Sequence, residues 1–103
     1  MERASSRASQ SETNFKVKVL KELRSIPNLW CVKTQQLSLR GTPDVLICYR
    51  GKFIAWELKR DGKDATVQQQ YELDKIASAE GIARVVTPAT FKEHLKELLC
   101  LES

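Results

Sequence analysis

The sequence is poor in the residues that build disulfide frameworks, zinc sites and histidine-based metal sites. Its 103 residues include one histidine and three cysteines, Cys31, Cys48 and Cys100, which are far apart and form no CxxC pair. These numbers argue against a disulfide scaffold and against a zinc site. We expect reduced cysteines, with the thiols of Cys31 and Cys48 buried in strands. The lone His94 is expected on the surface, at the flank of a helical apolar stripe.

Long apolar runs are absent as well. No run approaches the roughly 20 residues that a membrane-spanning helix needs. Residues 1–12 hold Arg and Ser but no apolar core of a secretory signal. We therefore expect a cytoplasmic protein. A chain of 103 residues allows one domain, and a domain of that size buries roughly two thirds of its unfolded surface.

The positive charge is concentrated in one part of the chain. The net charge is +4, and residues 33–63 contain seven cations and three acids, a difference that equals the whole net charge. Such a cluster favours the binding of a polyanion such as nucleic acid, although an ordinary solvated basic surface is the alternative. The candidate nucleic-acid-binding residues within it are Lys33, Arg40, Arg60 and Lys63.

Hydrophobic spacing and turn residues predict seven elements in the order α-β-β-β-α-β-α. A disordered polar tail is expected at residues 1–8, followed by a helix that begins at a capping box of Ser9 and Glu12. Gly81 is expected to close the second helix. This order predicts an α/β fold, in which helices pack on one mixed sheet. The expected strands are residues 29–36, 44–49, 52–59 and 83–86, and the expected helices begin at residues 9, 66 and 87.

A short predicted hairpin carries charged residues at positions that are normally apolar. If Arg50 and Gly51 form a two-residue turn, Asp44 lies directly opposite Glu57, with Cβ atoms roughly 5 Å apart. Lys59 then lies two residues further along the same face. A longer turn would change this register.

Two opposed carboxylates destabilise a sheet unless one is protonated or a cation lies between them. Mg²⁺ typically takes one or two carboxylates, several waters and substrate phosphate oxygens. A lysine beside it can orient a water or stabilise charge on a phosphate. The pattern therefore indicates metal-dependent phosphodiester hydrolysis. An ordinary salt bridge between Lys59 and Asp44 or Glu57 at the sheet rim explains the residues equally well.

Three segments of the sequence, "RGTPDVLI", "GKFIAWELK" and "TVQQQYELDKIASAEG", together resemble the VRR-NUC family. These virus-type replication-repair nucleases belong to the PD-(D/E)XK superfamily, whose motif corresponds here to Asp44 followed by Glu57, Leu58 and Lys59. The resemblance runs from about residue 12 to the last helix. It implies a restriction-endonuclease-like αβββαβ core with a mixed four-stranded sheet and a C-terminal helix, in a nuclease domain of residues 9–103.

The resemblance also implies a role for each motif residue. Asp44 and Glu57 would ligate Mg²⁺ or Mn²⁺, with the backbone carbonyl of Leu58 as a further ligand. Lys59 would serve the hydrolytic water.

Two more polar residues match the family but also have a structural interpretation. Glu12 matches the family's extra acidic residue, and it is equally well explained as part of a capping box. Gln69 would stand beside the catalytic lysine, whereas Thr66-x-x-Gln69 is itself a capping box. The position of Gln69 in line with Leu73, on the inward face of the helix, favours a role in the site.

The expected function is that of a Mg²⁺- or Mn²⁺-dependent endonuclease acting on DNA, especially branched or structured DNA. Stand-alone members of the family resemble Holliday-junction resolvases and are expected to be homodimers, here in a bacterial or phage-infected cell. Two alternatives stay open. One is a non-catalytic nucleic-acid-binding module on a nuclease-like fold, and the other is a nuclease of ordinary duplex DNA.

Overall fold

A computed structural model of the chain describes residues 3–35 and 39–102, with the side chains described from Thr13 onward. It confirms the predicted order of elements and the α/β fold with a mixed four-stranded sheet and a C-terminal helix. The strands lie in the order β1-β2-β3-β4; the first three are antiparallel, and β4 runs parallel to β3. The elements are α1 (Arg3–Arg24), β1 (Leu29–Lys33), β2 (Val45–Tyr49), β3 (Lys52–Leu58), α2 (Val67–Ser78), β4 (Ile82–Val86) and α3 (Phe91–Leu99).

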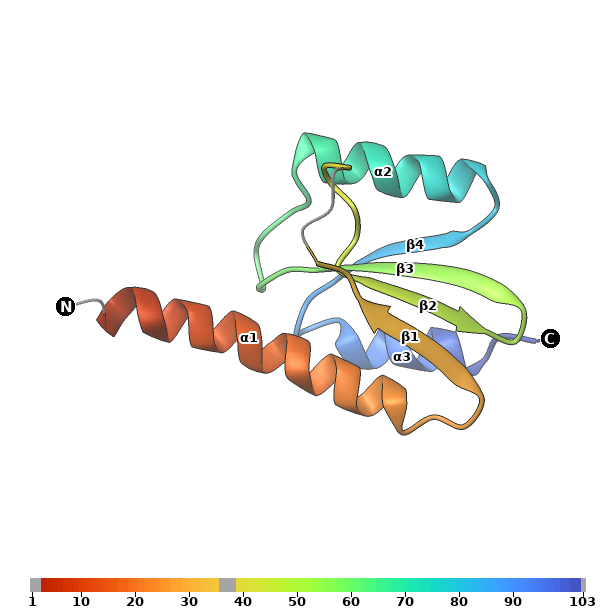
Figure 1. Cartoon of the computed structure of the whole chain (residues 1–103), viewed down its shortest axis with the longest axis horizontal. Coiled ribbons are helices and arrows are strands. Elements are labelled where there is room, and N and C mark those ends of the chain that lie inside the picture. Colours follow the sequence, from red (N-terminus) through yellow and green to blue (C-terminus); the bar gives the residue numbers. More distant parts are fainter. Residues whose placement is uncertain (1–2, 36–38, 103) are drawn as a thin grey trace.

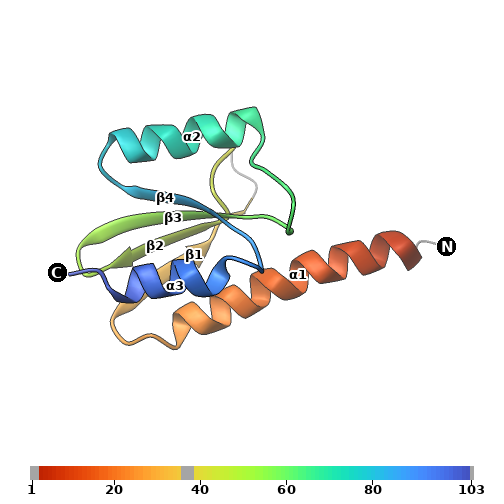
Figure 2. The same cartoon turned by 180° about the vertical axis from the view of Figure 1, so that it is seen from behind.

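The sheet separates α2 from α1 and α3 (Figures 1 and 2). Side chains alternate between the two faces of a strand, so β2 and β3 each direct every second residue toward α1 and α3. These residues are almost fully buried, and they meet apolar residues of the two helices in one cluster. Its members are Val19, Leu20 and Leu23 of α1, Val45, Ile47 and Tyr49 of β2, Ile54, Trp56 and Leu58 of β3, Val86 of β4, and Phe91 and Leu98 of α3.

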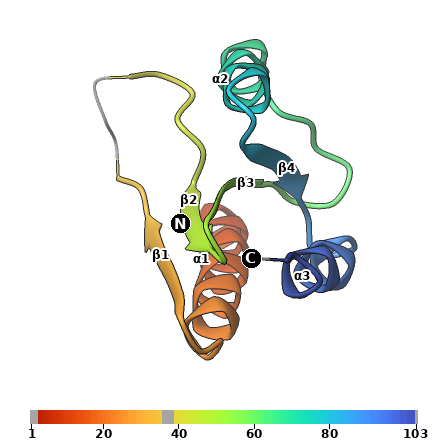
Figure 3. The same ribbon diagram turned by 90° about the vertical axis from the view of Figure 1, so that its right-hand side faces the viewer.

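The opposite face of the sheet is covered unevenly. Helix α2 packs on β4 and β3, and the end-on view shows it above β4, away from β1 (Figure 3). As a consequence, Trp30, Cys48 and Phe53, which are direct neighbours across three strands, are all exposed. The prediction that Cys48 is buried is therefore wrong. Cys31, on the face toward α1, is half-buried.

The first helix begins earlier than predicted. The backbone is helical from Arg3, so the expected tail at residues 1–8 overlaps the helix, and Ser9 is not its first cap. The sequence contains neither glycine nor proline before Pro27, and those are the residues that most strongly interrupt a helix. Residues 1 and 2 lie outside the described part of the chain. No helix in the described ranges is long and apolar enough to cross a membrane.

The last helix begins later than predicted, at Phe91 instead of Thr87. Residues 87–90 first form a turn, in which the Thr90 N–H donates to the Thr87 carbonyl at 3.0 Å and the Thr90 hydroxyl accepts from the Thr87 N–H at 3.0 Å. On α3, His94 is half-buried, with its ring centroid 6.4 Å from that of Trp56. His94 therefore lies at the edge of the core with part of its side chain exposed, and the expectation of a surface residue is only partly confirmed.

The end of α2 corrects a further prediction. The left-handed residue that follows the helix is Glu80, with φ 73°, and not Gly81. The Gly81 N–H donates to the Ile76 carbonyl at 2.9 Å, which satisfies an orphan carbonyl of the last turn. Gly81 is needed for a different reason, because a Cβ there would lie 2.8 Å from Cγ2 of Ile76.

We therefore predict opposite effects for two neighbouring substitutions. Glu80→Gly should stabilise the protein by about 0.5–1 kcal/mol, because glycine adopts positive φ without a steric penalty. Gly81→Ala should destabilise it by about 1–3 kcal/mol, because the added methyl group overpacks against Ile76. Urea denaturation monitored by tryptophan fluorescence measures both. The reverse order of stabilities would contradict this description of the helix end.

Candidate active site

The hairpin of β2 and β3 has the predicted register. Tyr49 pairs with Lys52, and the ladder continues to Val45 opposite Trp56. Arg50 and Gly51 both have positive φ, 54° and 78°, as a two-residue type I′ turn requires. Continuing the register by one step places the next two residues, Asp44 and Glu57, opposite each other where the ladder ends.

Asp44 is held from two sides. Its Oδ2 accepts a hydrogen bond from the Leu58 N–H at 2.9 Å, and its Oδ1 lies 3.9 Å from Nζ of Lys16 on α1. Lys16 was missed by the sequence analysis. A signal for it exists, because Lys16 has helical spacing to Val19 and Leu23, both fully buried. A cation in line with a buried stripe points toward the sheet.

Glu57 lies in a much less favourable environment. Its side chain is buried, with only 3% of the residue exposed. Oε2 lies 4.0 Å from Nζ of Lys59, and Oε1 is buried without a hydrogen-bond partner among the described residues. Burial, followed by the negative charge of Asp44, raises the pKa of Glu57 from its ordinary value of 4.5 to about 8. The carboxyl group is therefore mostly protonated at neutral pH in the absence of a further cation.

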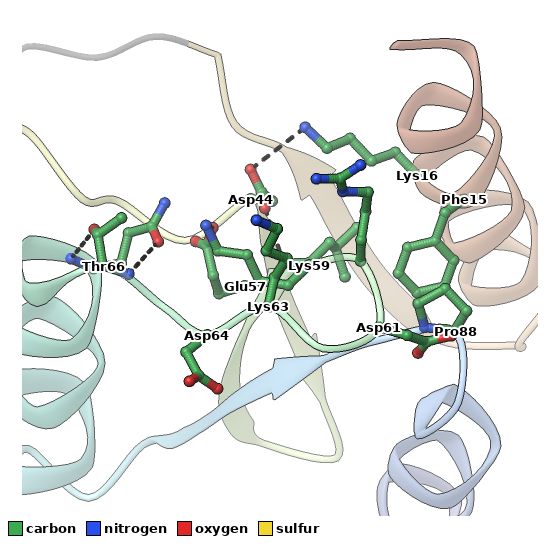
Figure 4. Close-up of a pocket in the computed structure, with 13 residues that line it drawn as sticks. Phe15, Lys16, Asp44, Glu57, Lys59, Asp61, Lys63, Asp64, Thr66 and Pro88 are labelled. Atoms are coloured by element: carbon green, nitrogen blue, oxygen red, sulfur yellow. Dashed lines mark hydrogen bonds and ion pairs between the residues drawn. The ribbon is translucent and has the colours of Figure 1, made fainter. Parts of the chain in front are cut away.

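These residues open into a cleft of about 810 Å³ at the end of the sheet (Figure 4). The cleft brings together most of the predicted site residues, namely Asp44, Glu57, Leu58, Lys59 and Gln69, with Arg60 and Lys63 of the predicted basic set. The sequence analysis did not anticipate Phe15, Lys16, Asp61, Asp64, Thr66 and Pro88, which also line it.

Three predicted residues have a different outcome. Lys33 and Arg40 do not line this cleft; they line a second cavity beside it. The backbone of Glu12 belongs to α1, but its side chain lies outside the described part of the structure, so its role stays a prediction.

Gln69 forms the predicted capping box and also lines the cleft, while its role in catalysis stays a prediction. Its Oε1 accepts from the Thr66 N–H at 2.8 Å, and its own N–H donates to the Thr66 hydroxyl at 3.2 Å, which completes a capping box at the start of α2. The half-buried side chain also lines the cleft with Lys59 and Glu57. The capping box therefore orients Gln69 at the edge of the site.

The donor set fits a hard divalent cation. Oε1 of Glu57 is buried without a hydrogen-bond partner among the described residues, and the Asp44 carboxylate lies beside it. Mg²⁺ commonly takes one or two carboxylates and completes its shell with water and phosphate. No group of three or more His, Cys, Asp or Glu suited to a metal occurs in the described ranges, so the protein would supply a two-carboxylate site. The alternative of a salt bridge at the rim is present in part, but the contact of Lys59 leaves Oε1 of Glu57 unpartnered.

Comparison of the chain with known protein families, with curated proteins and with solved structures gave no match. The resemblance to VRR-NUC nucleases therefore depends on the motif residues of the sequence.

The buried carboxyl group predicts an unusual dependence of stability on pH. In metal-free buffer the folded state keeps the Glu57 proton up to about pH 8, whereas the unfolded chain releases it near 4.5. The unfolded state therefore binds fewer protons between these values, and the free energy of unfolding falls as pH rises through this window. We expect a loss of roughly 2–4 kcal/mol from this group between pH 5 and pH 9.

Urea denaturation in EDTA at several pH values tests this expectation. Glu57→Gln should remove the loss and become more stable than the wild type above neutral pH. Glu93→Gln, at an exposed position on α3, is the matched control and should follow the wild type. Parallel pH profiles for all three proteins would contradict the raised pKa.

Proposed function

We propose that the protein is a Mg²⁺- or Mn²⁺-dependent endonuclease that hydrolyses phosphodiester bonds of DNA. The proposal is carried by the opposed pair of Asp44 and Glu57, with Lys59 beside it. One buried oxygen of Glu57 has no hydrogen-bond partner within the described part of the chain. The family resemblance of the motif supports the same activity.

Each residue has a defined contribution. Asp44 and Glu57 would hold the metal, with the carbonyl of Leu58, and the Leu58 N–H fixes the orientation of Asp44. The metal would supply positive charge to a phosphate and lower the pKa of a bound water. The Lys59 ammonium lies in the cleft, where it can orient the attacking water and stabilise negative charge on the phosphate. Lys16 holds the other oxygen of Asp44 from α1.

The proposed substrate class depends on the charge of the cleft with a metal bound. Its lining includes four cations, Lys16, Lys59, Arg60 and Lys63, and four carboxyl groups, those of Asp44, Glu57, Asp61 and Asp64. A divalent cation held by Asp44 and Glu57 would leave an excess of positive charge, which favours a polyanion. We propose branched DNA as the preferred form and a homodimer as the active assembly, in the cytoplasm of a bacterial or phage-infected cell. A two-fold dimer would present two clefts to a symmetric junction. The exposed row of Trp30, Cys48 and Phe53 is an apolar surface that such an interface could cover.

Loss of either carboxylate should abolish cleavage. Asp44→Asn and Glu57→Gln should lower the single-turnover rate by about a hundredfold or more, roughly 2.7 kcal/mol of barrier, while leaving DNA binding largely intact. The assay uses labelled four-way, flap and linear DNA of matched sequence with Mg²⁺, with Mn²⁺ and with excess EDTA. We expect the four-way junction to be cut faster than the linear duplex.

Glu93→Gln serves as the control and should cleave like the wild type. Full cleavage by either site variant, or full activity in excess EDTA, would contradict a metal-dependent mechanism. DNA binding without cleavage under every condition would favour the non-catalytic module. Equal rates on linear and branched DNA would favour a nuclease of ordinary duplex.

Gln69→Glu separates capping from a role in the site. Glutamate suits the third position of a capping box, so the change should alter stability by at most about 1 kcal/mol. Its carboxylate would also join Asp44 and Glu57 in the cleft, repel the scissile phosphate and pair with Lys59. We predict a stable variant with cleavage reduced by about tenfold or more, roughly 1.4 kcal/mol of barrier.

A melting curve beside single-turnover cleavage at saturating Mg²⁺ tests this prediction. Gln68→Glu adds the same charge one residue earlier, at an exposed position outside the cleft, and should cleave at close to the wild-type rate. A stable Gln69→Glu protein with the wild-type rate would leave Gln69 with its capping role alone.

A further inference from the structure

A second cavity, of about 580 Å³, adjoins the cleft. It lies between the end of β1 and the segment that leads into β2, and Lys33, Gln35 and Arg40 are among its lining residues. Lys16 and Asp44 line both cavities. The two hollows are therefore neighbours, and they share the carboxylate that we propose as a metal ligand. We call the second cavity the side groove.

The side groove contains two exposed cations, Lys33 and Arg40, beside the neutral Gln35 amide and the shared pair of Lys16 and Asp44. Lys33 and Arg40 are exposed and form no ion pair with any acid among the described residues. The Thr34 hydroxyl donates to the Pro43 carbonyl at 2.7 Å, and the Thr42 hydroxyl donates to the Leu39 carbonyl at 2.9 Å. Both hydroxyl protons are thus used to shape the walls, and the cations remain available for a ligand.

The local backbone fixes the two positions from which the cationic side chains extend. Lys33 is the last residue of β1 and pairs with Val45, directly after Asp44. Arg40 precedes Gly41, which has φ 81° and lies so close to α2 that a Cβ would stand 2.6 Å from the Gln68 carbonyl oxygen. Only glycine allows both this φ and this approach. The segment that carries Arg40 is therefore packed against the first turn of α2.

The composition of the side groove distinguishes phosphate from base recognition. No aromatic side chain is among its described lining residues, and these residues therefore offer no surface on which a base could stack. Its volume of about 580 Å³ is far larger than one phosphate group, and its lining includes the cations Lys16, Lys33 and Arg40. Cations without stacking partners position a nucleic acid through its backbone, independently of sequence.

From these observations we propose that the side groove binds the phosphate backbone of the DNA strand whose scissile phosphate lies in the cleft. This inference rests on the proposed function and extends it. Lys33 and Arg40 contact phosphates on one side of the scissile bond, and Lys16 lies at the junction of the two cavities. The side groove therefore contributes affinity and register but no base specificity.

Binding of a labelled 20-base-pair DNA in EDTA, measured by fluorescence anisotropy over a range of salt concentrations, tests the proposal without cleavage. The test variant is Lys33→Ala/Arg40→Ala. The control is Lys52→Ala/Lys92→Ala, which removes two exposed cations away from both cavities. Each variant changes the net charge from +4 to +2, so a general charge effect would be equal in the two.

We expect the slope of log affinity against log salt to become shallower by about 2 in the test variant, because each lost phosphate contact removes about one unit. The control should change it by less than about 0.5. Equal slopes for the two variants, or no binding by the wild type at low salt, would overturn the proposal.

Cleavage by the same proteins separates this inference from the proposed function. A selective change of slope without any cleavage by the wild type would support the side groove and refute the nuclease. Cleavage by the wild type, together with equal salt slopes for the test and control variants, would refute DNA binding in the side groove. It would leave the nuclease proposal in place.

Discussion

The burial of the Glu57 carboxyl group opposite Asp44 is the constraint on which the rest of the site depends. The two-residue turn at Arg50 and Gly51 sets the register, and the apolar cluster enforces it, because a slip of one residue would turn Trp56 out of the core. The strand therefore cannot relieve Glu57 by shifting. The cost of the buried carboxyl is met by the hydrophobic packing on the other face of the same strand.

The two carboxyl groups are treated differently by their surroundings. Asp44 has a backbone N–H donor and a lysine, so its position and charge are supported. Glu57 has only a lysine at 4.0 Å, and one of its oxygens has no partner among the described residues. The carboxylate pair therefore lacks one interaction among the described residues, at Oε1 of Glu57, which a cation would supply. A chain selected only for stability would gain from a neutral residue at this position.

The sequence was sufficient to predict interactions that depend on local spacing. The opposition of Asp44 and Glu57 follows from the length of one turn, and the capping box of Thr66 and Gln69 follows from a three-residue offset. Contacts that depend on tertiary packing were not predictable in this way. Lys16 meets Asp44 because α1 crosses the sheet at that point, and Cys48 is exposed because α2 covers β3 and β4 instead of β2. The helical spacing of Lys16 directs it toward the sheet, but no local pattern specifies its contact with Asp44 or the strands that α2 covers.

Binding of DNA in the side groove would affect the protonation of Glu57. A DNA backbone in the side groove would bring negative phosphates next to Asp44, and this charge would favour the protonated form of Glu57 still more. A divalent cation would reverse the effect by neutralising both partners, and its binding would release the Glu57 proton. Through this proton, DNA and metal would oppose each other, because DNA favours the protonated carboxyl and the metal needs the ionised one. The direct attraction between the cation and the phosphates acts in the opposite direction. The net coupling free energy is the same whichever ligand binds first.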